Sequence, residues 1–326
     1  MALKLAILDD YQSVALEMAD WTPVTNSGID ITVFTDTIKD QDALVSRLEP
    51  FAIVCIMRER TPFPESLLER LPNLKLLVTT GMRNYAVDIA AATTLGIRVV
   101  GTQVPSRSTT EHIWALILGI ARNIVPDATR TGTPGDAGLP WQAGRLATGL
   151  HGKTLGLIGL GRLGASVAEI AKVFGMRVIA WSQNLTAEKA AQVGVEFAGT
   201  KQRLLADSDF VSVHVVLSPR SVDLISTNEL QLMKKTAFLI NTSRGPIVNE
   251  KALVAALRDG TIAGAALDVY DVEPLPSDNE LRTLGDKVLL TPHGAYVTDD
   301  TYKPFFEETV EDVVQWLGGS AIRVLN

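Results

Sequence analysis

The sequence predicts an α/β protein with two doubly wound parallel-sheet domains. The chain has 326 residues, and a chain of this length usually folds around more than a single hydrophobic core. Short apolar runs alternate with amphipathic segments in both halves, which is typical of parallel sheets covered by helices on both faces. A glycine-rich turn, GLIGLGRLG at 156–164, joins a strand-like run to a helix-like run near the middle of the chain.

The first series of alternating elements covers about the first hundred residues. Its apolar runs predict strands at 3–8, 31–34, 52–57, 74–79 and 97–100. A long helix is predicted at 108–123, and its nearly all-apolar body indicates burial. The segment 126–149 is dense in Gly, Pro and Thr, so we expect a loop-like arm with a functional or interface role.

The second series follows this arm. It predicts strands at 154–160, 177–181, 210–216, 237–242, 263–270 and 287–293. Helical patterns lie at 162–174, 186–192, 201–206, 227–233 and 249–259. The last stretch, 298–319, is predicted to be one amphipathic helix.

Charge and composition exclude several classes of protein. The net charge is −7 and the pI about 5.2, without a block of Lys or Arg, which argues against a nucleic-acid or anionic-membrane partner. The single cysteine, Cys55, excludes an intramolecular disulfide framework and a cysteine metal cluster, and its apolar surroundings predict a buried, unreactive thiol. No metal site is predicted. Because no signal-like or membrane-spanning run is found, we expect a cytoplasmic protein.

The glycine turn has the context of a dinucleotide-binding fingerprint. Gly159 permits a tight turn, Gly161 lets the backbone approach a pyrophosphate, and Gly164 lets helix and strand pack closely. The N–H groups at the start of the helix would then face the phosphate charge. The alternative is a strand–helix turn that binds no ligand, but the flanking strand and helix favour a dinucleotide.

The second strand of this domain ends AWSQN and leaves the identity of the cofactor open. Ser182 stands where an acidic residue usually holds the ribose hydroxyls of NAD. Without that carboxylate a 2′-phosphate is not repelled, although no arginine lies beside Ser182 to bind one. Ser182 and Asn184 can hydrogen-bond either ribose, so either NAD(H) or NADP(H) is expected as the cofactor. The absence of the acidic residue slightly favours a site that tolerates NADP(H).

Three later segments place polar side chains where strands end. Arg244 lies in NTSRGPIVNEKAL, Asp268 and Glu273 in ALDVYDVEPLP, and His293 in VLLTPHGAY. Because ligands bind at the carboxyl ends of parallel strands, these residues are expected to converge beside the pyrophosphate. Taken singly, each could be a surface ion pair or a loop cap.

In this order the segments resemble the D-isomer-specific 2-hydroxyacid dehydrogenases, a family that includes glyoxylate/hydroxypyruvate reductases and phosphoglycerate dehydrogenases. The resemblance covers the whole chain. It implies a Rossmann NAD(P)-binding domain, 102–296, inserted into a discontinuous flavodoxin-like substrate domain, 1–101 plus 297–326. It also implies an oxidoreductase acting on CH–OH groups with NAD or NADP, for which a glyoxylate-like or hydroxypyruvate-like 2-keto acid is the expected substrate. A non-catalytic NAD(H)-sensing regulatory protein on the same fold is the alternative.

The resemblance implies a role for each residue. Arg244 would bind the substrate carboxylate, His293 would donate or accept the proton, and Glu273 would orient the imidazole. The cofactor contacts it implies are Thr80, Gly159, Gly161, Arg162, Leu163, Gly164, Ser182, Asn184, Val215, Thr242, Asp268, His293 and Tyr296. The substrate contacts it implies are Gly81, Met82, Arg83, Trp141 and Arg244.

Several positions depart from the family pattern or remain open. Arg83, in GMRN, could favour a doubly charged substrate or could face water, and Tyr296 could narrow the active site. Trp141 matches an aromatic residue that crosses a dimer interface, so a homodimer through the 126–149 arm is expected. Of the other histidines, we expect His112 to be a packing residue, although the family has a Glu-His pair at this position. We expect His214 to be structural or a wall of the cofactor pocket, and nothing points to a catalytic role for His151.

Overall fold

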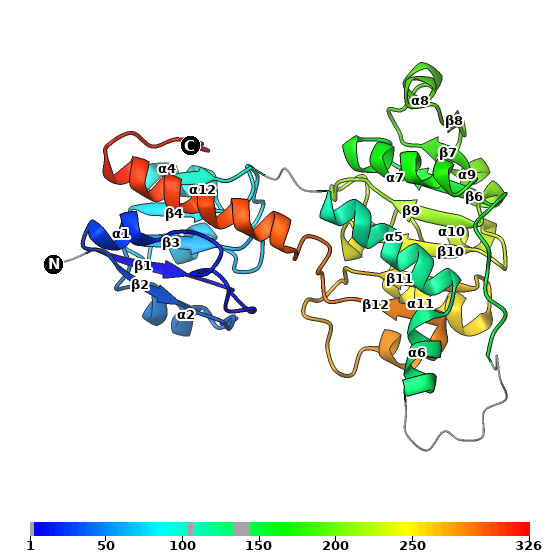
Figure 1. The fold of residues 1–326 in the computed structure, drawn as a ribbon, viewed down its shortest axis with the longest axis horizontal. Helices are drawn as coiled ribbons and strands as arrows, with labels where there is room; N and C mark the ends of the chain where they lie inside the picture. The colour runs from blue at the N-terminus through cyan, green and yellow to red at the C-terminus, as the bar shows by residue number, and fades with distance from the viewer. Residues whose placement is uncertain (1–2, 104–106, 133–143) are drawn as a thin grey trace. The chain divides into compact units, whose positions relative to one another are not determined.

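Two segments far apart in the sequence build the first unit of the protein. In the computed structural model, which describes residues 3–103, 107–132 and 144–326, one unit comprises Met1–Ser106 and Val297–Asn326 and the other Arg107–Tyr296 (Figure 1). Both are parallel-sheet α/β units, as the sequence predicts.

The first unit contains a five-stranded parallel sheet in the order β2-β1-β3-β4-β5. Its strands are β1 (Lys4–Ile7), β2 (Asp30–Val33), β3 (Ile53–Ile56), β4 (Leu76–Thr79) and β5 (Arg98–Gly101). Its helices are α1 (Thr22–Asn26), α2 (Gln41–Leu48), α3 (Glu65–Leu68), α4 (Ile89–Thr94) and the long α12 (Asp299–Leu317). Asp40 and Asp88 accept backbone N–H groups at the starts of α2 and α4, which fixes where these helices begin.

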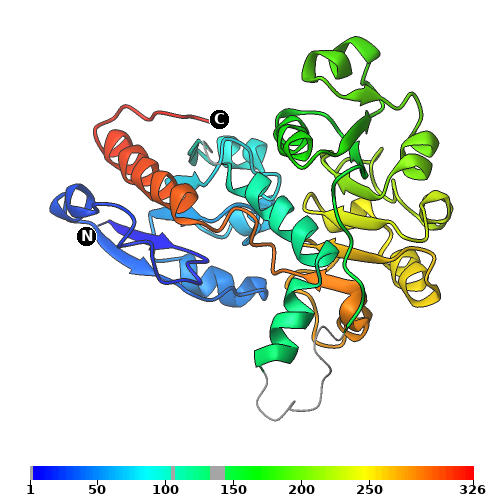
Figure 2. The same ribbon diagram turned by 45° about the vertical axis from the view of Figure 1, so that its right-hand side comes forward.

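Both faces of this sheet are covered, because strand residues alternate between two cores. Ala6, Val54 and Leu77 pack in one core with side chains of α2, α3 and α4. On the other face α1 packs against α12, which crosses β4 and β5, and Figure 2 gives a second view of α12 and the sheet. The chain after α12 then pairs antiparallel with β5 at Val324.

The second unit has a seven-stranded parallel sheet in the order β12-β11-β10-β9-β6-β7-β8. Its strands are β6 (Thr154–Ile158), β7 (Arg177–Trp181), β8 (Glu196–Phe197), β9 (Phe210–Val213), β10 (Phe238–Asn241), β11 (Gly264–Leu267) and β12 (Val288–Leu290). Because β7 and β9 lie on opposite sides of β6, the chain reverses its direction across the sheet at β6.

Helices cover both faces of this sheet as well. One core contains side chains of α5 (Ser108–Ala121), α7 (Arg162–Val173) and α8 (Ala187–Val193). The other contains side chains of α9 (Lys201–Asp207), α10 (Thr227–Leu232) and α11 (Glu250–Asp259). Short 3-10 helices lie at Gly245–Ile247, Glu280–Thr283 and Gly285–Lys287. Figure 1 shows α5 and α7 in front of the sheet.

Part of the predicted loop-like arm is a helix, which corrects that interpretation. Residues Ile124–Gly132 form α6, and Asn123, with φ 55°, separates it from α5. Pro126 lies in the first turn, where its missing N–H costs no hydrogen bond, and Arg130 pairs with Asp127 one turn earlier. The Gly and Pro content of the following residues obscured this short helix.

Several strands end earlier than predicted. The residues after these strand ends form the edge of the sheet on which the site is built. For example, β9 ends at Val213 and β11 at Leu267, whereas the apolar patterns continue to 216 and 270. The residues beyond these ends leave the sheet. No helix in the described parts of the chain is long and apolar enough to cross a membrane.

Candidate active site

The glycine-rich turn connects β6 to α7 and has room for a ligand. Gly159 has φ 105°, and a Cβ there would lie 2.5 Å from the carbonyl oxygen of His214. A Cβ on Gly164 would lie 2.4 Å from the carbonyl oxygen of Gly159. By contrast, a Cβ on Gly161 would meet nothing within 4 Å, so open space lies before the start of α7. The turn therefore fits a pyrophosphate in the way the fingerprint predicts.

Other predicted cofactor residues lie around this turn. Arg162 and Leu163 begin α7, and the side chain of Val215 approaches Gly159. The hydroxyl of Thr242, directly after β10, is buried without a hydrogen-bond partner among the described residues. This hydroxyl is therefore available to form a hydrogen bond with a bound ligand. Ser182 and Asn184 follow β7 and are partly or fully exposed.

His214 lies behind the glycine-rich turn, where its backbone carbonyl faces Gly159. Its ring is buried, both nitrogens lack a partner in the described structure, and burial lowers its pKa to about 4. A neutral imidazole carries no charge to bind phosphate, so His214 fits the structural role that was one of its two predicted roles.

Arg244 is held in a tight turn after β10. Asn241 donates from Nδ2 to the carbonyl of Arg244 at 2.9 Å and accepts the N–H of Ser243 at 3.0 Å, while Ser243 Oγ donates to the carbonyl of Val213. A Cβ on Gly245 would lie 2.0 Å from the carbonyl carbon of Tyr270. The Arg244 turn therefore packs directly against the loop that follows β11.

His293 and Glu273 form a short hydrogen bond. Nδ1 of His293 lies 2.6 Å from Oε2 of Glu273, and the second carboxylate oxygen accepts the backbone N–H of Tyr270 at 3.0 Å. A carboxylate can only accept, so Nδ1 carries a proton, and Nε2 is the ring atom that can exchange a proton with a substrate. The ring of Tyr296 stands edge-on to the imidazole, with centroids 6.2 Å apart.

His293 itself has an uncommon backbone conformation, with φ 54°. The next two residues are fixed by Asp268, whose carboxylate accepts the backbone N–H groups of Gly294 at 2.9 Å and Ala295 at 3.0 Å. Burial by itself raises the pKa of Asp268, but hydrogen bonds from His112, Thr291 and Gly294 outweigh burial and lower it below its ordinary value. The donors therefore favour the charged form of Asp268, and its carboxylate holds the turn that follows His293 in the chain.

His112 is more than the packing residue that was expected. Its Nε2 lies 3.0 Å from the hydroxyl of Thr291 and 3.3 Å from Oδ1 of Asp268. The apolar helix around His112 suggested packing, whereas its position near the start of α5 places the ring at the polar edge of the sheet. Thr291 and Tyr270 also bind in this network, since the hydroxyl of Tyr270 donates to the carbonyl of Thr291, and sequence reasoning identified neither.

The remaining predicted residues lie in the first unit or outside the described chain. Thr80 is buried after β4, where its hydroxyl accepts the N–H of Arg58 at 2.9 Å. Gly81 has φ 92° and donates its N–H to Thr102, while Met82 and Arg83 are exposed. Trp141 lies outside the described residues.

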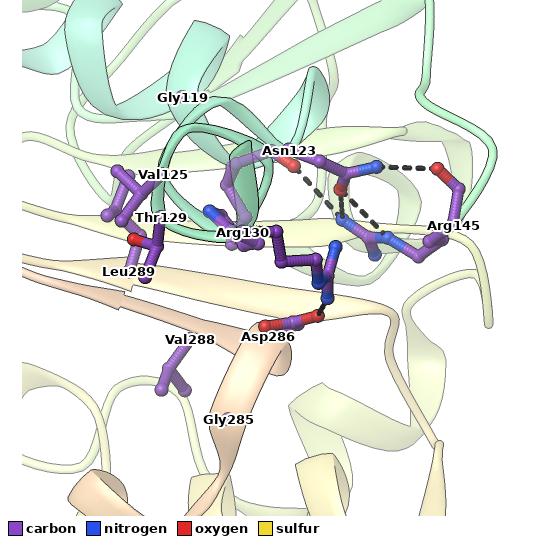
Figure 3. Close-up of a pocket in the computed structure, with 12 residues that line it drawn as sticks. Gly119, Asn123, Val125, Thr129, Arg130, Arg145, Gly285, Asp286, Val288 and Leu289 are labelled. Atoms are coloured by element: carbon purple, nitrogen blue, oxygen red, sulfur yellow. Dashed lines mark hydrogen bonds and ion pairs between the residues drawn. The ribbon is translucent and has the colours of Figure 1, made fainter. Parts of the chain in front are cut away.

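A cavity of about 340 Å³ in the second unit lies away from the Glu273–His293 pair (Figure 3). It lies between the end of α5, α6 and the amino end of β12, whereas Thr291 and His293 follow the carboxyl end of that strand. Its charged groups are already paired: Arg130 binds Asp286, and Arg145 binds Asn123. The cavity is therefore not the catalytic site. In the described parts of the chain no group of His, Cys, Asp and Glu is arranged to hold a metal ion.

The fold and this edge define an NAD-dependent α/β oxidoreductase, and comparison with known proteins gives its family. Residues 114–295 match the D-isomer specific 2-hydroxyacid dehydrogenase, NAD binding domain. The chain is 36% identical to a glyoxylate reductase of Korarchaeum cryptofilum over 88% of this chain and 83% of the other. It is 40% identical to a glyoxylate reductase of Aeropyrum pernix over 78% and 76% of the two chains.

A solved structure agrees with these sequence matches. Phosphoglycerate oxidoreductase from Vibrio cholerae superposes with a TM-score of 0.87 at 33% identity, over 98% of this chain and all of the other. The chain therefore belongs to the D-isomer specific 2-hydroxyacid dehydrogenase family.

The glycine turn yields a paired prediction. Gly164→Ala should lower the melting temperature of the cofactor-free protein, because its methyl group meets backbone. Gly161→Ala should leave that temperature unchanged, since φ is −84° and the space is open. Its methyl group should nevertheless weaken NADH binding about tenfold or more, given that overpacking costs about 1–3 kcal/mol.

Thermal unfolding without cofactor and a fluorescence titration with NADH measure the two effects. If Gly161→Ala bound NADH as tightly as the wild type, the open space would not be where the cofactor binds.

Proposed function

We propose that this protein reduces a small 2-keto acid to the D-2-hydroxy acid, with glyoxylate or hydroxypyruvate as the substrate. The short Glu273–His293 pair, next to the loop that packs on the Arg244 turn, carries this proposal. The glyoxylate reductases to which the chain is similar support the choice of substrate. In this reaction the nicotinamide supplies the hydride when it is bound at the glycine turn.

Each residue of the site has a separate chemical role. Arg244 offers a planar set of N–H donors suited to a carboxylate, and its turn is fixed by Asn241 and Ser243. His293 donates a proton from Nε2 to the keto oxygen, or accepts one from the hydroxyl in the reverse direction. Glu273 holds Nδ1 protonated and stabilises the charged imidazole.

In this proposal the two units have different roles. The unit with the glycine turn, corresponding to the predicted 102–296 domain, binds the dinucleotide. For the other unit, corresponding to 1–101 plus 297–326, the resemblance implies substrate contacts at Gly81, Met82 and Arg83, although the N–H of Gly81 already binds Thr102. Thr80, Trp141 and Tyr296 keep the contacts that the resemblance implies.

Substitution of Arg244 tests the reaction. Arg244→Ala should lower kcat/KM for glyoxylate by about 100-fold or more, equivalent to about 3 kcal/mol of transition-state stabilisation. Affinity for NADH should change little, because the guanidinium binds the substrate. Arg258→Ala removes an exposed ion pair with Glu280 and is the matched control.

NAD(P)H oxidation with a panel of 2-keto acids measures the effect. An unchanged kcat/KM would remove Arg244 from the mechanism. Tight cofactor binding without turnover of any acid by the wild type would favour an NAD(H)-sensing protein instead.

We infer that the cofactor site tolerates NADP(H) as well as NAD(H). The residues that follow β7 are Ser182, Gln183 and Asn184, so no carboxylate in this segment repels a 2′-phosphate. Ser182→Asp should lower the ratio of kcat/KM with NADPH to that with NADH about tenfold or more, through like-charge repulsion. Ser182→Ala, which adds no charge, should leave the ratio near that of the wild type. An equal ratio in all three proteins would show that Ser182 does not meet the ribose.

We further propose a homodimer through the 126–149 arm. Aliphatic side chains are exposed directly before this arm and near its end: Leu146 is 94% exposed, Ile124 55% and Val125 50%. Exposed apolar groups of this kind support a contact surface. Sedimentation should give about twice the chain mass of 35.1 kDa, and Leu146→Glu should shift it toward the monomer. Leu16→Glu, at an exposed leucine of the first unit, is the control, and a monomeric wild type would refute the dimer.

A further inference from the structure

We propose that His112 is a positioning residue of the active site, which acts through Asp268 on the turn that carries His293. This inference deepens the proposed function and rests on it for its kinetic consequences. The structural part depends only on contacts within the second unit.

The donor in this contact can be assigned from its partners. Nε2 of His112 lies 3.3 Å from a carboxylate oxygen of Asp268, which can only accept. It also lies 3.0 Å from the hydroxyl oxygen of Thr291, and that hydroxyl donates its single proton to the same carboxylate oxygen. Both neighbours therefore accept from His112, so Nε2 carries the proton and is shared between them.

Asp268 needs this donor because its side chain is fully buried, with 0% exposure. A buried carboxylate is costly unless donors surround it. Two of its donors are the N–H groups of Gly294 and Ala295, and the other two are Thr291 and His112. Oδ1 of Asp268 accepts from His112, Thr291 and Gly294, and Oδ2 accepts from Ala295, so the side-chain donors help to hold the carboxylate that binds both backbone N–H groups.

The backbone bonds are the ones that matter to catalysis. Gly294 and Ala295 directly follow His293, whose φ of 54° is uncommon and must be held by its surroundings. Loss of the His112 donor leaves Asp268 underpaired and loosens the turn. Since Arg244 sits in a separate turn fixed by Asn241 and Ser243, substrate binding should be affected less than proton transfer.

A pair of substitutions separates positioning from packing. His112→Leu keeps an apolar side chain but removes the donor, whereas His112→Gln keeps an N–H donor of similar reach. His112→Leu should lower kcat about tenfold or more, since small misplacements of a catalytic group are costly, with KM for glyoxylate changed less than about threefold. His112→Gln should recover most of the loss. His151→Leu, at a surface histidine of the same unit, is the control.

Amide hydrogen exchange tests the structural part without any assay of activity. In His112→Leu the peptide covering 291–296 should exchange faster, while the peptide covering 241–245 should not change. This measurement decides on His112 even if the wild type turns over no 2-keto acid, an outcome that would refute the proposed function alone.

The proposal is overturned by unchanged exchange at 291–296 in His112→Leu. It is also overturned by a kcat within twofold of the wild type, or by a loss in His112→Gln as large as in His112→Leu, because either result would mean that the donor has no role.

Discussion

The active edge of this protein depends on one buried carboxylate. Asp268 follows β11, the strand between those that lead to Arg244 and to His293, and it holds the backbone directly after the imidazole. Four hydrogen bonds meet on its two oxygens, one from the start of α5 and three from the residues after β12. The segments after β11 and β12, and the start of α5, therefore cannot shift independently.

A second buried carboxylate shows what this donor set achieves. Asp312, on α12, is also fully buried and binds Arg323, yet its Oδ2 lacks a partner among the described residues. Burial raises the pKa of Asp312 to about 7 against the opposing effect of Arg323, with Glu308 and Glu311 adding to the rise. For Asp268 the donors outweigh burial instead. The number and placement of donors, rather than burial, decide whether a carboxylate stays charged and can hold a catalytic turn.

The sequence predicted what depends on local pattern. The two sheets followed from apolar runs, and the glycine turn followed from its flanking strand and helix. Arg244, Glu273 and His293 could be placed at strand ends because the runs before them end there. The helix α6 was missed because Pro126 and the glycine-rich segment beyond it read as a loop, although Pro is tolerated in a first turn.

The role of His112 could not be read from the sequence for a different reason. The part of α5 that follows it is apolar and largely buried, so the local pattern assigned it to packing. Its partners, Asp268 and Thr291, lie more than 150 residues away, and only the pairing of β11 with β12 brings them to the start of α5. A buried acidic residue at a strand end was the available signal, because such a group requires donors from somewhere in the fold.

This arrangement is consistent with the proton transfer proposed for His293, whose backbone conformation is uncommon. Glu273 fixes the imidazole through Nδ1, and Asp268 fixes the backbone on the other side of the same residue. With ring and backbone both held, the φ of 54° is maintained by bonds outside the residue itself. In the proposed reaction, the change left to His293 is the exchange of a proton at Nε2, which is the property that a general acid–base needs.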